Sequence, residues 1–91
     1  MSLVLNQLPH INCHDVVFTV NGEEWAIEIE TGSQLKKNKK ELLQKVQANN
    51  KKYAEKWFFI VTNKNLLADY RKLGEAIDRN SVIERLNEIR N

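Results

Sequence analysis

Three acidic side chains, Asp15, Glu28 and Glu30, are the residues of this 91-residue sequence best suited to do chemistry. Carboxylates that converge on one face of a sheet repel one another unless something neutralises them. Mg²⁺ (or Mn²⁺) fits such a site, because it takes one or two carboxylates and completes its octahedron with water and phosphate oxygens. A cation held there would polarise a phosphodiester and activate a water molecule. The alternative is that the acids face solvent or pair with nearby lysines such as Lys36 or Lys37.

The elements that must bring these acids together are two strands joined by a tight turn. The runs 15–20 and 24–30 are rich in β-branched and aromatic residues, and Asn21-Gly22 between them is typical of a type I′ turn. A two-residue loop fixes the register, so Asp15 faces Glu28 with roughly 5 Å between their Cβ atoms. Because strand residues alternate between faces, the third acid shares the face of Glu28. The opposite, predominantly apolar face is expected to be the core side; it carries His14, Val16, Phe18, Val20, Trp25, Ile27 and Ile29.

Hydrophobic periodicity predicts the elements that follow the hairpin. A helix is expected over 35–54, and the apolar run 57–62 is typical of a buried strand reached by a parallel crossover. A short helix over 65–73 and a short strand over 75–78 come next. The last helix begins at a capping box, Ser81 to Glu84. The expected buried stripes are Leu42, Leu43, Val46 and Tyr53 on the first helix, and Val82, Ile83, Leu86 and Ile89 on the last.

The resulting order, a β-hairpin and then α-β-α-β-α, predicts an α/β fold with a mixed sheet flanked by helices. The length suits one domain over residues 1–91. Residues 1–13 are compatible with either a short helix or a strand. The opening Met1-Ser2-Leu3 also resembles an expression-vector remnant, which would make the chain a fragment of a longer protein.

Composition and charge narrow the function classes. No apolar run approaches the roughly 20 residues that span a bilayer, so no membrane partner is expected. The single cysteine, Cys13, excludes an internal disulfide and fits the reducing cytoplasm. Between Lys36 and Lys52 lysines outnumber acids seven to one, which suggests an anionic partner, with DNA the first candidate. The residues expected to contact nucleic acid are Lys36, Lys37, Lys39 and Lys40. A solvated helix face is the other interpretation of these lysines.

The acids, the hairpin and the elements after it resemble the PD-(D/E)XK nuclease superfamily over about residues 14–62. Asp15 matches its first acid and Glu28 its second, while Glu30 stands where the pattern has lysine. The run 27–32, followed by 43–46 and Tyr53, also resembles nuclease-like domains of plasmid and transposon replication-relaxation proteins. In such divergent members the following helix can supply the lysine. The resemblance therefore implies a restriction-endonuclease-like core, a metal at Asp15 and Glu28, and a catalytic set completed by Glu30 with Lys36, Lys40 or Lys45.

Three hypotheses follow. The first is a metal-dependent DNA endonuclease-type domain of a mobile-element or DNA-processing protein, in which Glu30 is an added ligand or a general base. The second is a catalytically silent nuclease-like module that binds DNA or a protein partner. The third is an assembly domain in which an exposed sheet edge pairs with another copy to form a homodimer.

Overall fold

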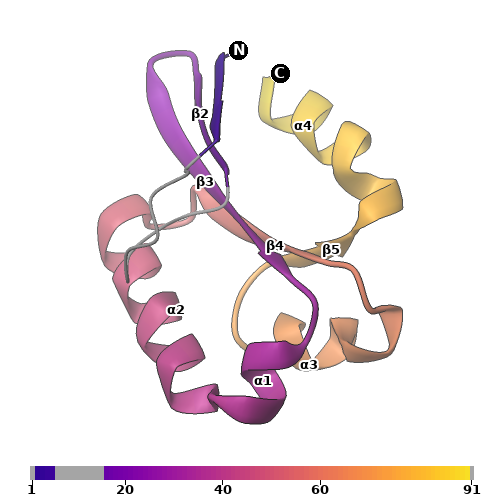
Figure 1. Cartoon of the computed structure of the whole chain (residues 1–91). Helices are drawn as coiled ribbons and strands as arrows, with labels where there is room; N and C mark the ends of the chain where they lie inside the picture. Colours follow the sequence, from indigo (N-terminus) through magenta and orange to yellow (C-terminus); the bar gives the residue numbers. More distant parts are fainter. Residues whose placement is uncertain (1, 6–15, 91) are drawn as a thin grey trace.

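The structure, a computed structural model, describes residues 2–5 and 16–90 and has one five-stranded mixed sheet (Figure 1). The strands lie side by side in chain order. The first three pair antiparallel, and the third, fourth and fifth pair parallel. The strands are β1 (Ser2–Leu5), β2 (Val16–Val20), β3 (Glu23–Glu30), β4 (Trp57–Val61) and β5 (Ala76–Asp78). The α/β mixed fold is thus confirmed, and the N-terminal segment that the sequence left open contains a strand.

The predicted hairpin is present with the predicted register. Asn21 and Gly22 form the turn with φ of 52° and 79°, the positive values that a type I′ turn requires. Within β2 and β3, Phe18 lies opposite Trp25 and Val17 opposite Ala26, as the two-residue loop dictates. Asp15 lies outside the described residues, so its pairing with Glu28 stays a prediction, as does the place of His14.

The helix expected over 35–54 is two helices, and this part of the prediction was wrong. Helix α1 (Ser33–Lys37) ends at Asn38, whose non-helical backbone (φ −148°, ψ 64°) breaks the helix before α2 (Lys39–Tyr53) begins. The Asn38 side chain accepts a hydrogen bond from the backbone N–H of Glu41 and donates one back to its carboxylate, over 3.2 and 2.6 Å. Asn38 therefore caps α2, and this local gain offsets the loss of helical continuity.

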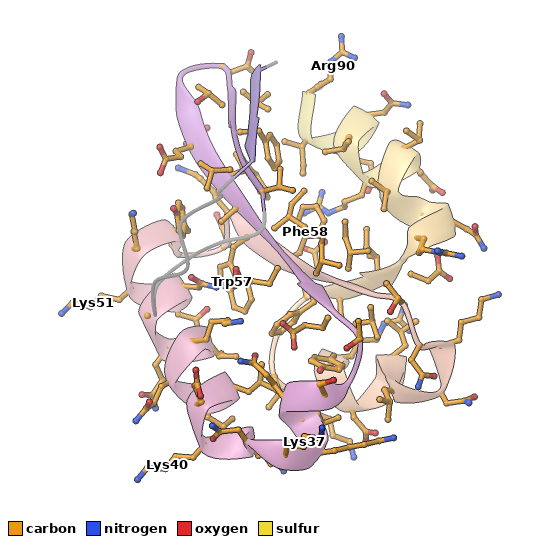
Figure 2. All side chains as sticks on the ribbon, in the orientation of Figure 1. Lys37, Lys40, Lys51, Trp57, Phe58 and Arg90 are labelled. Carbon is orange, nitrogen blue, oxygen red and sulfur yellow. The ribbon has the colours of Figure 1, made fainter. Side chains whose placement is uncertain are left out.

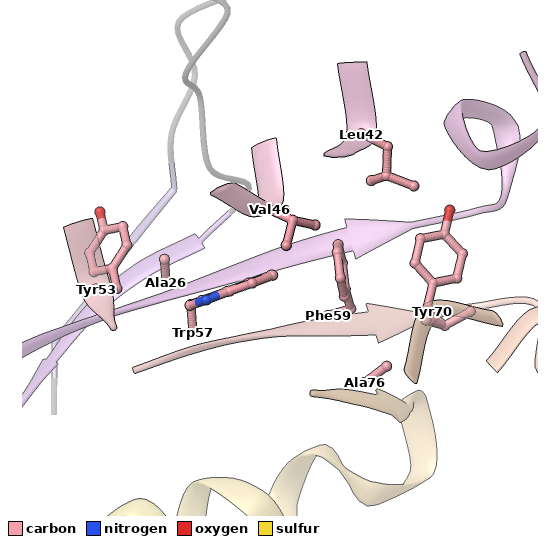
Figure 3. Packing of buried hydrophobic residues seen from close by; sticks show 9 residues of the cluster. Ala26, Leu42, Val46, Tyr53, Trp57, Phe59, Tyr70 and Ala76 are labelled. Atoms are coloured by element: carbon pink, nitrogen blue, oxygen red, sulfur yellow. The ribbon is translucent and has the colours of Figure 1, made fainter. Parts of the chain in front are cut away.

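Helices cover both faces of the sheet (Figure 1). Helix α2 and the short α3 (Leu67–Arg71) pack on one face, where the buried cluster includes residues of α2, β4 and α3 (Figure 3). Helix α4 (Val82–Arg90) packs on the other face through Leu86 and Ile89. The hairpin consequently has two buried faces. The prediction of a single core side was incomplete, and Ile29, on the face expected to be buried, is partly exposed.

The buried stripes predicted for the first and last helices were wrong at two positions. On α2, Leu43 is exposed and Asn49 takes its place in the buried set with Leu42, Val46 and Tyr53. On α4, Ile83 is 70% exposed, because Leu86 and Ile89 set which side of the helix meets the sheet.

The C-terminal half otherwise follows the prediction. A 3₁₀ turn, η1 (Lys64–Leu66), leads into α3, and a second, η2 (Arg79–Ser81), leads into α4. The expected capping box at Ser81 is replaced by a cap on η2. The Asp78 carboxylate accepts from both the backbone N–H and the hydroxyl of Ser81, over 3.0 and 3.1 Å. Among the described residues, no helix is long and apolar enough to cross a membrane.

Candidate functional site

The two described acids of the predicted site, Glu28 and Glu30, are buried at the end of β3. Glu28 is 0% exposed and Glu30 is 6% exposed. Both lie on the face that Ala26 shares, beneath α2, because alternate residues of a strand point the same way. Ionised carboxylates in such a place need charged or hydrogen-bonding partners, since burial removes their hydration.

Lys45 of α2 supplies a cation to both acids. Its Nζ lies 3.7 Å from Oε2 of Glu28 and 3.6 Å from Oε2 of Glu30. The same Nζ donates a hydrogen bond to Oε1 of Gln34, over 3.1 Å, which ties it to α1. The Lys45 side chain is 20% exposed, so the cluster of Glu28, Glu30 and Lys45 touches solvent through the lysine.

Helix phase explains why this lysine faces the acids. Leu42, Val46, Asn49 and Tyr53 are the buried residues of α2, spaced three to four positions apart. Lys45 falls beside this stripe, three residues after Leu42, so its stem packs along the edge of the buried face while its ammonium reaches the end of β3.

Tyr70 of α3 holds the remaining oxygen of Glu30. Its hydroxyl donates to Oε1 of Glu30 over 3.1 Å, and the tyrosine is fully buried against Phe59, with ring centroids 5.1 Å apart (Figure 3). Burial, and then the negative charge of Glu30 and this hydrogen bond, raise the pKa of Tyr70 far above its ordinary value. Tyr70 is therefore a neutral donor, and the two oxygens of Glu30 are divided between a phenol and an ammonium.

A second tyrosine, Tyr53, contacts an acidic side chain near the other end of β3. The Tyr53 hydroxyl donates to Oε1 of Glu24 over 3.2 Å. Burial, and then the charge of Glu24 and its hydrogen bond with some contribution from Glu28, raise the pKa of Tyr53 to about 12. Tyr53 is therefore a neutral donor to Glu24.

The lysines predicted from the sequence as catalytic or DNA-contacting residues divide into two groups. Of the three candidates for a catalytic lysine, Lys45 reaches the acids, whereas Lys36 and Lys40 are exposed on α1 and α2. Lys37 and Lys39 are exposed as well, and Figure 2 shows Lys40 projecting from the outer side of α2. The alternative in which the acids pair with a nearby lysine therefore holds for Glu28 and Glu30, and the lysine is Lys45 instead of Lys36 or Lys37.

Gln34 and Tyr70 belong to the site but were not foreseen. Tyr70 was placed within a predicted helix, yet its contact with Glu30 spans forty positions of sequence and depends on the packing of α3. The one available signal was its type, since a buried tyrosine hydroxyl usually finds a partner.

The described residues contain no group of three or more histidine, cysteine or acidic side chains that could hold a metal. The predicted set includes Asp15, which lies outside these residues, so the metal site stays a prediction. A scan against protein-family models and searches of curated proteins and of solved structures found no match to this chain.

Proposed function

We propose that this chain is a metal-dependent endonuclease-type domain acting on DNA, with Mg²⁺ or Mn²⁺ as its cofactor. The observation that carries the proposal is the position of Lys45 Nζ within 3.7 Å of both Glu28 and Glu30. In the superfamily that the hairpin resembles, a lysine follows the second acid by two positions and its side chain lies beside that acid. Here Glu30 occupies that strand position, and a lysine from α2 reaches the same place.

Each residue then has a definite role. Asp15 and Glu28 would hold the cation, and a divalent ion bound there would supply the charge that polarises a phosphodiester and lowers the pKa of a bound water. Lys45 stabilises the charge that develops on the phosphoryl group. Glu30 accepts from Tyr70 and pairs with Lys45, so it acts as a positioning residue for the lysine, with the added-ligand and general-base roles as alternatives.

The exposed lysines supply the DNA contact. Lys36 and Lys37 lie on α1, which directly follows the end of β3, and Lys39 and Lys40 open α2. Four cations beside the end of the strand that carries the acids would track a phosphate backbone without reading its sequence.

A cleavage assay on supercoiled plasmid, with Mg²⁺ or Mn²⁺ and with EDTA, tests the proposal. Wild type should nick the plasmid only with metal, and Glu28→Gln and Lys45→Met should each lose activity. Glu24→Gln is the matched control, because Glu24 lies on the same strand and face but bonds to Tyr53. Metal-dependent nicking that survives Glu28→Gln unchanged would refute the assigned site.

A thermal melt tests the metal separately from cleavage. A cation that binds only the folded state stabilises it by about 2.7 kcal/mol at a hundred times its dissociation constant. Asp15→Asn and Glu28→Gln should each abolish this gain, and Glu24→Gln should keep it. The alternative function, a catalytically silent module that binds DNA or a protein partner, is favoured by the complete burial of Glu28. It predicts no metal shift in wild type.

A further inference from the structure

The three parallel strands end level with one another and leave a polar crevice at their carboxyl edge. Glu30, Val61 and Asp78 lie in register as the last residues of β3, β4 and β5. Beyond the ends of β4 and β5 is a hollow of about 130 Å³. Its lining residues are Val61, Thr62, Lys64, Asp78, Arg79 and Asn80. The carboxyl ends of parallel strands are the usual place for ligands in open α/β sheets.

The charge of this crevice is positive. Lys64 and Arg79 contribute two cations, both exposed, and within the described part of the chain neither forms an ion pair. The one acid of the lining, Asp78, uses Oδ1 to accept from the N–H and hydroxyl of Ser81. Asn80 adds an amide. Two cations, one carboxylate and neutral donors thus line the hollow together with the buried Val61, and the net charge of the lining is positive by one unit.

The size and donor set fit one tetrahedral oxyanion. A hollow of about 130 Å³ has room for several water-sized groups. A guanidinium binds phosphate oxygens in a bidentate manner and an ammonium adds a point charge, so this pair of side chains suits a phosphate group. We propose that the crevice of Lys64, Arg79 and Asn80 binds a backbone phosphate of nucleic acid. The choice of nucleic acid as the ligand rests on the proposed function. Binding in the crevice does not require the metal ion of that function.

The crevice lies close to the end of the strand that carries the acids. Thr62, in its lining, donates its backbone N–H to the carbonyl of Glu30 over 3.0 Å. Asp78 is two strands from Glu30, about 10 Å at the usual strand spacing. A nucleic-acid strand bound in the crevice would lie along the carboxyl edge of the sheet. This edge is at the opposite end of β3 from the hairpin turn.

Binding of a labelled oligonucleotide in EDTA, measured by fluorescence polarisation over a range of salt concentrations, tests this site. Lys64→Ala with Arg79→Ala should weaken binding roughly tenfold at low salt and reduce the slope of log K against log salt by about one. The matched control is Lys51→Ala with Arg90→Ala, which removes the same charge from exposed residues near the ends of α2 and α4 (Figure 2). Its slope should equal that of wild type. An equal loss in both double variants, or none in the first, would overturn the proposal.

A second arm separates nucleic acid from free phosphate. Inorganic phosphate at millimolar concentration should raise the melting temperature of wild type less than the oligonucleotide does. If phosphate stabilises wild type but the Lys64 and Arg79 variant binds oligonucleotide normally, the crevice takes free phosphate and the proposal fails. The binding assay contains no metal, so its result does not depend on cleavage. If wild type never cleaves plasmid but the Lys64 and Arg79 variant binds oligonucleotide more weakly than wild type, the nuclease proposal is refuted and the crevice proposal is supported.

Discussion

Replacing Lys45 with methionine removes the cation between Glu28 and Glu30 while keeping a side chain of similar length. The two carboxylates are 0% and 7% exposed, and the ammonium lies 3.7 and 3.6 Å from them. Two such pairs attract by about 4 kcal/mol each at an effective dielectric constant of 20, and much of that gain is offset by desolvation of the lysine. Removing one partner of a buried ion pair typically costs 3–5 kcal/mol.

We expect Lys45→Met to lower the free energy of unfolding by about 3 kcal/mol at pH 7, at the low end because Lys45 keeps 20% of its side-chain exposure. For a domain of this length that is a large share of a total of roughly 5–14 kcal/mol, and it lowers the melting temperature by about 12–24 °C. Urea and thermal unfolding followed by circular dichroism measure both quantities. Lys40→Met, on the exposed side of the same helix, should stay within about 0.5 kcal/mol of wild type.

A double variant sharpens the test. The double variant Lys45→Met with Glu30→Gln should recover part of the loss at pH 7, because one of the two buried charges is gone. A Lys45→Met protein as stable as Lys40→Met at pH 7 would show that the ammonium does not neutralise these acids, and the reasoning about the site would be refuted.

Two further predictions concern the tyrosines. Tyr70→Phe should lower the free energy of unfolding in urea by about 1–3 kcal/mol, because it removes a hydrogen-bond donor from the buried Glu30. Tyr53→Phe should lower it less, since its acceptor Glu24 is exposed, and equal losses would contradict this reasoning. In alkali, both tyrosines of the chain have raised pKa values, to about 12 for Tyr53, so the unfolded chain releases these protons first. The stability that these raised pKa values contribute is complete below pH 10 and should decrease as the pH rises above 10, with phenolate absorbance at 295 nm appearing mainly on unfolding. A native tyrosine that titrates near pH 10 would contradict the assigned burial.

The hairpin was predictable because turn chemistry alone fixes it. Asn21-Gly22 demands positive φ at two positions, and a two-residue loop leaves one register, so the shared face of Glu28 and Glu30 followed directly. The break at Asn38 had a signal too, since Asn38 followed three residues later by Glu41 is a capping pattern. The continuous run of helix-forming residues around it concealed that pattern.

Other features depend on contacts that no local pattern contains. The sequence placed Lys36, Lys40 and Lys45 on the same predicted helix, and only the packing of α2 on the sheet separates the one that reaches the acids from the two that are exposed. Tyr70 meets Glu30 because α3 returns to the same sheet face as α2. The exposure of Ile83 has a similar origin, because α4 is oriented by Leu86 and Ile89 against the hairpin. Long-range packing decided each of these cases.

The ionic cluster beneath α2 lies on a sheet face that is otherwise mostly apolar. Ala26, Val46 and Val61 belong to its buried cluster, and Asn49 of α2 is buried as well. An apolar replacement of a buried ion cluster is often neutral or stabilising, so folding alone gives no reason to keep two carboxylates and a lysine there. The cluster also lies in the last three residues of β3, which precede α1 and its exposed lysines. In the proposed function, this charge at the carboxyl edge of the sheet would meet the cation and the phosphate.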